Sequence, residues 1–137
     1  MTQPDTKERG LAVPHNILVV DDNRDICRTV ADMLSTTDAR IYEAFDGADA
    51  LGVLDKNKVD LAIVDLLLGG PVSGDIVVER AKLRHCPVIT MSGTLASDRR
   101  GRDLGTPHLV KPFHTHQLVS LVEKTLVQGT RPAVVLR

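Results

Sequence analysis

The stretch Asn16-Ile17-Leu18-Val19-Val20-Asp21-Asp22-Asn23 decides how this chain folds. Its first five residues form a short apolar run rich in β-branched side chains, which predicts a strand buried on both faces. The polar residues that follow end the strand, and Asp22 or Asn23 is placed to cap a helix. From Ile26 to Leu34 the apolar residues recur at i, i+4, i+7 and i+8, which is typical of an amphipathic helix.

The same alternation of strand and helix continues along the chain. Further short apolar runs predict strands at residues 39–44, 60–64, 87–91 and 108–110. The run at 39–44 is short and mixed in polarity, so we expect it at an edge of the sheet.

Three further helices are expected between and after these strands. Asp46 is placed to cap the first of them and Ser73 the second. The second carries an apolar set that we expect to face the core: Ile76, Val77, Ala81 and Leu83. The last helix has the clearest apolar stripe: Leu118, Leu121, Val122 and Leu126.

This order of elements predicts a doubly wound α/β fold. Five strands that alternate with helices imply right-handed crossovers and a parallel sheet covered on both faces, in the flavodoxin-like order 2-1-3-4-5. The segment between the fourth and fifth strands is short and contains several glycines and Pro107, so the fourth helix should be short or irregular. We expect a flexible N-terminal arm at 1–15, one domain at 16–127 and a C-terminal tail at 128–137.

The composition excludes several classes of function. The chain has 137 residues, 17 of them Lys or Arg and 18 Asp or Glu, and its net charge of -1 argues against a protein that binds nucleic acid over its whole surface. Aromatic residues make up only 2%, too few for base stacking. The apolar runs are too short to span a membrane, and Cys27 and Cys86 lie far apart, as in a cytoplasmic protein with free thiols.

Polar residues of complementary chemistry stand at the carboxyl ends of the expected strands. Asp21 and Asp22 follow the first strand and Asp65 the third, while Ser92 and Lys111 end the fourth and fifth. In the expected order these ends meet at one crevice, where the strand order reverses. A single Asp there could simply cap a helix, but five such residues arriving by chance is much less expected.

The chemistry of this set favours phosphoryl transfer with a metal ion. Three carboxylates placed together repel one another, and a hard divalent cation such as Mg²⁺ relieves the repulsion. Lys111 can hold a phosphoryl oxygen as a point charge, and the Ser92 hydroxyl can donate to another. One carboxylate then serves as the nucleophile.

At these residues the chain resembles the receiver domain of two-component response regulators. The resemblance covers about Asn16 to Val127 and rests on four motifs in the right order: Val19-Val20-Asp21-Asp22-Asn23, Asp60-Leu61-Ala62-Ile63-Val64-Asp65-Leu66, Pro87-Val88-Ile89-Thr90-Met91-Ser92-Gly93 and Val110-Lys111-Pro112-Phe113. It implies a phosphorylatable switch of the stand-alone type in a bacterial phosphorelay, located in the cytoplasm. The only reactions expected are self-phosphotransfer and autodephosphorylation.

The resemblance also implies a role for each site residue. Asp65 would accept a phosphoryl group from a phosphohistidine on a sensor histidine kinase or a histidine phosphotransfer protein. Mg²⁺ would be held by Asp21, Asp22, Asp65 and the backbone carbonyl of Leu67. Ser92 would be the switch hydroxyl and Lys111 the residue that binds the phosphoryl group.

The chain departs from the usual receiver pattern at several positions. Gly69 stands where a proline is usual, Ser92 replaces the commoner threonine, and His108 replaces a Tyr or Phe. An imidazole cannot fill the same apolar slot as an aromatic ring. The charged run Asp98–Arg102 lies in the shortened fourth-helix region. Two interpretations of this run remain: a solvated loop, or a docking site for an acidic partner.

Three other functions compete with the receiver. A degenerate receiver acting as a phosphorylation-independent adaptor remains an alternative, because the fourth-helix region is remodelled. A phosphohydrolase would need a carboxylate two residues after its nucleophile, where this chain has Leu67 after Asp65 and Asn23 after Asp21. A flavin or nucleotide carrier would need a phosphate cradle where the loop after the first strand is acidic, and no GxxxxGK[ST] or GxGxxG motif occurs.

Overall fold

The structure, a computed structural model, describes residues 15–93 and 104–130. These residues form a five-stranded parallel sheet in the order β2-β1-β3-β4-β5, as the sequence predicts. The strands are β1 His15–Val20, β2 Ala39–Ala44, β3 Leu61–Asp65, β4 Val88–Ser92 and β5 His108–Val110. The helices are α2 Arg24–Met33, the 3₁₀ turn η1 Leu34–Thr36, α3 Gly47–Lys56, α4 Gly74–Leu83 and α6 Thr115–Thr130.

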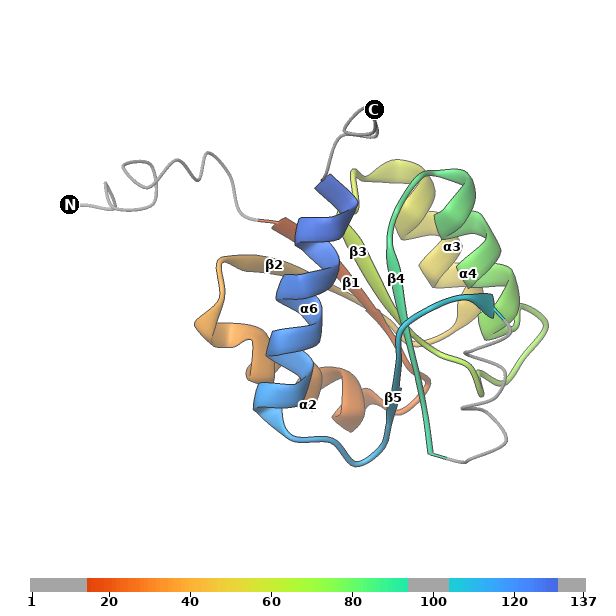
Figure 1. The fold of residues 1–137 in the computed structure, drawn as a ribbon. Coiled ribbons are helices and arrows are strands. Elements are labelled where there is room, and N and C mark those ends of the chain that lie inside the picture. Colours follow the sequence, from red (N-terminus) through yellow and green to blue (C-terminus); the bar gives the residue numbers. More distant parts are fainter. Residues whose placement is uncertain (1–14, 94–103, 131–137) are drawn as a thin grey trace.

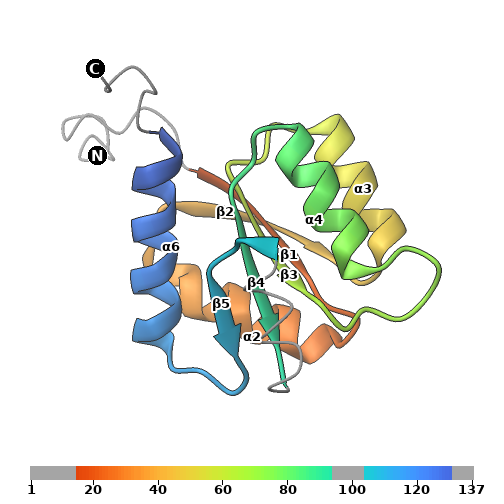
Figure 2. The same cartoon turned by 45° about the vertical axis from the view of Figure 1, so that its right-hand side comes forward.

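Helices cover both faces of the sheet. Figures 1 and 2 show α2 and α6 on one face and α3 and α4 on the other. Because side chains alternate along a strand, Ile17 and Val19 of β1 enter the core under α2 and α6, whereas Leu18 and Val20 enter the core under α3 and α4. The buried positions of β1 and β3 are therefore apolar on both faces up to Val20 and Val64, as the continuous apolar runs predict, whereas β4 also buries Thr90 and Ser92.

Two strands end one residue later than the sequence analysis expected. Asp65 is the last residue of β3 rather than the first after it, and Ser92 is the last residue of β4. Backbone hydrogen bonds extend the ladder one residue past β3, from Leu66 N to the Met91 carbonyl at 3.0 Å, and one residue past β5, from Lys111 N to the Ser92 carbonyl at 2.7 Å. The sheet itself thus fixes the backbone of the polar residues at this edge.

The expected N-caps are confirmed. The Asn23 side chain, rather than that of Asp22, accepts from the backbone N–H groups of Asp25 and Ile26 at the start of α2. Asp46 caps α3 and Ser73 caps α4 in the same manner. Asn23 and Asp46 come within three residues of the ends of β1 and β2, whereas Ser73 follows a longer loop after β3; each directs the chain back along a helix.

The prediction of which α4 residues face the core is partly wrong. Ile76 and Leu83 are 46% and 75% exposed, whereas Val78 is fully buried beside Val77 and Ala81. The helix packs against both the sheet and α3, so its buried face includes the adjacent positions Val77 and Val78. Ile76 and Leu83 lie seven residues apart on the face that turns to solvent.

Some expectations concern residues at the margins of the described chain. His15 of β1 pairs with Ala39 of β2, so it belongs to the sheet rather than to the expected arm. At the other end, α6 continues into the expected tail as far as Thr130. The arm at 1–14, the fourth-helix region with Asp98–Arg102, and residues 131–137 lie outside the described residues. Within the described residues, no helix is both long enough and apolar enough to cross a membrane.

Candidate functional site

Asp21 enters the site directly from the sheet. Its backbone N–H donates to the Ala44 carbonyl at 3.1 Å, which carries the β1–β2 ladder one residue beyond β1. The residue is only 1% exposed. One carboxylate oxygen accepts from the backbone N–H of Asn23 at 2.9 Å, so the turn that caps α2 also fixes this side chain.

Asp65 lies beside Asp21 at the end of the neighbouring strand. The residue is 4% exposed, and its Oδ1 accepts from the backbone N–H of Leu67 at 2.9 Å. The start of α4 packs onto its backbone, because a Cβ added at Gly74 would lie 2.5 Å from the Asp65 carbonyl oxygen. Only glycine allows this close approach without displacing Asp65.

Lys111 joins the two buried carboxylates. Its ammonium donates to Asp21 Oδ2 at 2.6 Å and to Asp65 Oδ2 at 3.2 Å. Burial disfavours the charged ammonium, but the hydrogen bond to Asp21 and the two negative charges outweigh burial and raise the pKa of Lys111. The lysine therefore stays protonated between the carboxylates.

Asp22 completes an acidic cluster. One oxygen from each of Asp21, Asp22 and Asp65 lies within 4.8 Å of the others, with Asp22 on the exposed rim. Burial raises the pKa of Asp21, and the charge of Asp65 adds to this effect, although hydrogen bonds from Lys111 and Asn23 oppose it. The site thus holds more negative charge than Lys111 neutralises.

The donor set fits a hard divalent cation. Mg²⁺ favours carboxylate oxygens, and the cluster supplies three of them around a partly open position. The backbone N–H of Gly69 approaches Asp22 Oδ2 at 3.4 Å, so the loop after β3 closes one side of the cluster. The side chain of Leu67 is exposed, and the role of its carbonyl as a metal ligand remains a prediction.

Ser92 lies at the end of β4 and is fully buried. Its hydroxyl is 3.1 Å from Nε2 of His108, whose Nδ1 is 2.6 Å from the Thr90 hydroxyl. His108 stands out in the sequence as a departure from the receiver pattern, but these contacts were not predicted, and neither was a role for Thr90. The sequence does contain a signal for this cluster, because Thr90 and Ser92 stand two residues apart and so face the same side of one strand.

Comparisons with known proteins agree with this geometry. The family model described as "Response regulator receiver domain" matches residues 17–123. The "Transcriptional regulatory protein PdtaR" of Mycobacterium tuberculosis is 32% identical over 127 residues, which are 90% of this chain and 62% of the relative. The chain therefore spans less than two thirds of that relative's length.

A second relative and two solved structures are also similar. "Sensor histidine kinase TmoS" of Ectopseudomonas mendocina is 35% identical over 118 residues, 80% of this chain and 12% of the relative. A CheY-like receiver domain protein from Methanospirillum hungatei superposes with a TM-score of 0.75 at 21% identity, covering 85% of this chain and 96% of that one. A signal receiver domain from Pseudomonas fluorescens gives 0.76 at 23%, covering 85% and 97%. The two solved structures support the fold alone.

Proposed function

Because this chain belongs to the response regulator receiver domain family, we propose that it is a signalling switch that accepts a phosphoryl group on Asp65. The donor would be the phosphohistidine of a sensor histidine kinase or a histidine phosphotransfer protein. The observation that carries the proposal is the Lys111 ammonium, 2.6 Å from Asp21 and 3.2 Å from Asp65, beside the third carboxylate of Asp22. This arrangement can bind a phosphoryl group next to a nucleophilic oxygen.

The contacts at each carboxylate favour Asp65 as the acceptor. An oxygen of Asp65 attacks phosphorus while the phosphorus–nitrogen bond of the donor breaks, and the electron pair stays on the imidazole nitrogen of the donor. A backbone N–H holds one oxygen of each residue, but Asp21 is less suited to this role because it is the more buried and lies closer to Lys111, at 2.6 Å against 3.2 Å for Asp65. Asp22 lies on the rim, away from the Lys111 contacts.

The other residues bind and neutralise. Mg²⁺ would be held by Asp21, Asp22 and Asp65 with the Leu67 carbonyl, and when bound it would supply charge neutralisation at the carboxylate and phosphoryl oxygens. Lys111 binds a phosphoryl oxygen opposite the acidic cluster. The Ser92 hydroxyl donates to a second phosphoryl oxygen, a contact that only the phosphorylated protein can make.

The partners follow from the same chemistry. The donor in the relay would be a histidine-containing protein, and the phosphorylated form would act through a downstream protein partner in the cytoplasm rather than by binding nucleic acid. One similar protein, TmoS, is itself named as a sensor histidine kinase, so receiver-like sequence also occurs in that class of protein.

The test is the intact mass of the protein after incubation with Mg²⁺ and acetyl phosphate. We expect one phosphoryl adduct on the wild type, none on Asp65→Asn, and none when EDTA is present. Asp38→Asn is the matched control, because Asp38 is an exposed carboxylate outside the cluster. An equal adduct on Asp65→Asn would refute the site. No adduct even with histidine kinases as donors would favour the adaptor instead.

A further inference from the structure

A chain of polar side chains leads from Ser92 into the sheet. Thr90 and Ser92 are both fully buried on β4, and His108 is the cross-strand neighbour of Thr90 on β5. The imidazole bridges the two hydroxyls, with Nδ1 2.6 Å from Thr90 Oγ1 and Nε2 3.1 Å from Ser92 Oγ. A phenyl ring at position 108 could make neither contact, so histidine contributes something specific here.

The hydrogen bonds around Thr90 indicate which ring nitrogen carries the proton. Thr90 has one hydroxyl hydrogen, and its shortest contact is the one to Nδ1. The Pro107 carbonyl, which can only accept, is 3.3 Å away and beyond the usual range for a hydroxyl donor. The Thr106 hydroxyl, at 2.9 Å, can donate to Thr90 instead. With the Thr90 hydrogen placed in its shortest contact, Nδ1 accepts, and the ring proton then lies on Nε2.

We propose that His108 is a positioning residue for Ser92, and this inference rests on the proposed function. The imidazole, anchored by Thr90, donates from Nε2 to the Ser92 oxygen. Since that oxygen then accepts from His108, its own hydrogen is directed away from the ring. Nε2 therefore does not compete with a phosphoryl group on Asp65 for the Ser92 hydrogen.

The first test measures the ring tautomer directly and requires no phosphodonor. Nitrogen-15 chemical shifts of His108 at neutral pH should show a protonated Nε2 and an unprotonated Nδ1. Thr90→Val should change this pattern, because it removes the donor to Nδ1 while keeping the shape of the side chain. A proton on Nδ1, or on both nitrogens, would overturn the assignment. This result stands whether or not Asp65 is phosphorylated.

The second test asks whether His108 acts through Ser92. The rate of Asp65 phosphorylation is measured for the wild type, His108→Phe, Ser92→Ala and the double variant. We expect His108→Phe to slow the wild type about five-fold, the size of a lost hydrogen bond, and to have no further effect once Ser92 is alanine. Equal slowing in both backgrounds would mean a general structural role and would overturn the proposal.

Two polar variants keep the test decisive if His108→Phe does not fold. His108→Gln places an amide N–H near the position of Nε2, whereas His108→Asn places its amide near Nδ1 and cannot reach Ser92. The Gln variant should therefore be the faster of the two, and an Asn variant as fast as Gln would contradict the proposal. If the wild type accepts no phosphoryl group, the proposed function fails, whereas the tautomer measurement still decides whether Nε2 donates to Ser92.

Discussion

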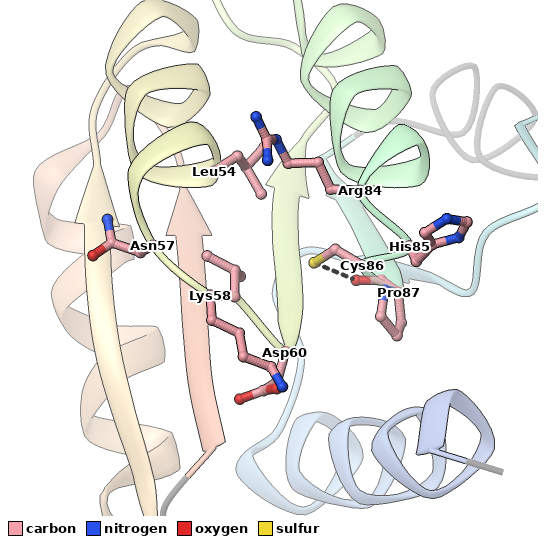
Figure 3. Close-up of a pocket in the computed structure, with 9 residues that line it drawn as sticks. Leu54, Asn57, Lys58, Asp60, Arg84, His85, Cys86 and Pro87 are labelled. Atoms are coloured by element: carbon pink, nitrogen blue, oxygen red, sulfur yellow. Dashed lines mark hydrogen bonds between the residues drawn. The ribbon is translucent and has the colours of Figure 1, made fainter. Parts of the chain in front are cut away.

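The two ends of the parallel strands, the amino-terminal and the carboxyl-terminal edge of the sheet, both carry charged side chains but arrange them differently. At the amino-terminal edge, a hollow of about 380 Å³ lies where β3 and β4 begin, with Lys58, Asp60 and Arg84 in its lining (Figure 3). Asp60 accepts from the backbone N–H of Asn16 at 2.8 Å, and Asp55 nearby accepts from two guanidinium groups, Arg80 at 2.6 Å and Arg84 at 3.0 Å. Each carboxylate there has its own donors.

At the carboxyl-terminal edge, three carboxylates crowd around the ammonium of Lys111. Burial, with a smaller contribution from the charge of Asp65, raises the pKa of Asp21, whereas hydrogen bonds from Arg80 and Arg84 lower the pKa of Asp55. The carboxylates of Asp55 and Asp60 at the amino-terminal edge thus already have donors within the protein. Unneutralised negative charge, rather than the size of a cavity, marks the edge that is prepared for a cation and a phosphoryl group.

The largest expected difference between the edges concerns their lysines. Lys111→Met should slow phosphorylation of Asp65 about 100-fold, the usual effect of removing a charged group that stabilises a transition state. Lys58→Met, at an exposed lysine of the amino-terminal edge, should leave the rate unchanged. Phosphorylation rates from intact mass would check both. Similar losses in the two variants would remove the distinction between the edges.

A glycine pair compares close packing at the site with open space elsewhere. Gly74→Ala should destabilise the fold by about 2 kcal/mol, because the new Cβ would meet the backbone of Asp65 and Leu66. Gly52→Ala, in α3 with nothing within 4 Å of the new Cβ, should stabilise it by about 0.5 to 1 kcal/mol. Urea unfolding measures both changes. If Gly74→Ala leaves the free energy of unfolding unchanged, α4 does not need its close contact with Asp65.

The smallest expected effect is on the pH dependence of folding stability, measured without Mg²⁺, for two variants that each neutralise one carboxylate. The two variants should change in opposite directions. Hydrogen bonds from Arg80, and then from Arg84, hold the pKa of Asp55 below its ordinary 3.8. The stabilisation that the ionised Asp55 carboxylate contributes is fully present above its ordinary pKa of 3.8 and is lost as the pH falls through the lowered pKa of the folded protein. Asp55→Asn should therefore be less stable than the wild type near neutral pH, with the gap closing in acid.

Asp21 should behave in the opposite way. Its pKa is raised above 3.8, so the folded wild type loses stability as the pH rises through that raised pKa. Asp21→Asn should therefore gain stability relative to the wild type on going from acid to neutral pH. Urea midpoints across this range check both variants, and the same sign for the two would contradict the contrast between the edges.

Much of the fold and of the site follows from local sequence. The apolar run before Asp21 predicts β1 because a strand buried on both faces must be apolar throughout, and Asp46 predicts a cap because its side chain reaches the N–H groups of the following turn. The gathering of Asp21, Asp65 and Lys111 follows from the strand order alone, since parallel strands end at one edge.

What the sequence did not reveal depends on contacts between distant elements. The exposed face of α4 at Ile76 and Leu83 is set by how the helix lies against α3 and the sheet, which its own periodicity does not encode. The bridge from Thr90 through His108 to Ser92 depends on the β4–β5 register, which pairs Thr90 with His108. One residue of slip would place the imidazole on the other face.

The most direct test of the account is to locate the phosphoryl group chemically. Borohydride reduces an aspartyl phosphate to an alcohol and so converts the modified residue to homoserine, which peptide mass mapping can identify. After incubation with Mg²⁺ and acetyl phosphate, the account predicts homoserine at position 65 and unmodified aspartate at 21 and 22. Homoserine at either of those positions, or at none of the three in a protein that has gained a phosphoryl group, would contradict it.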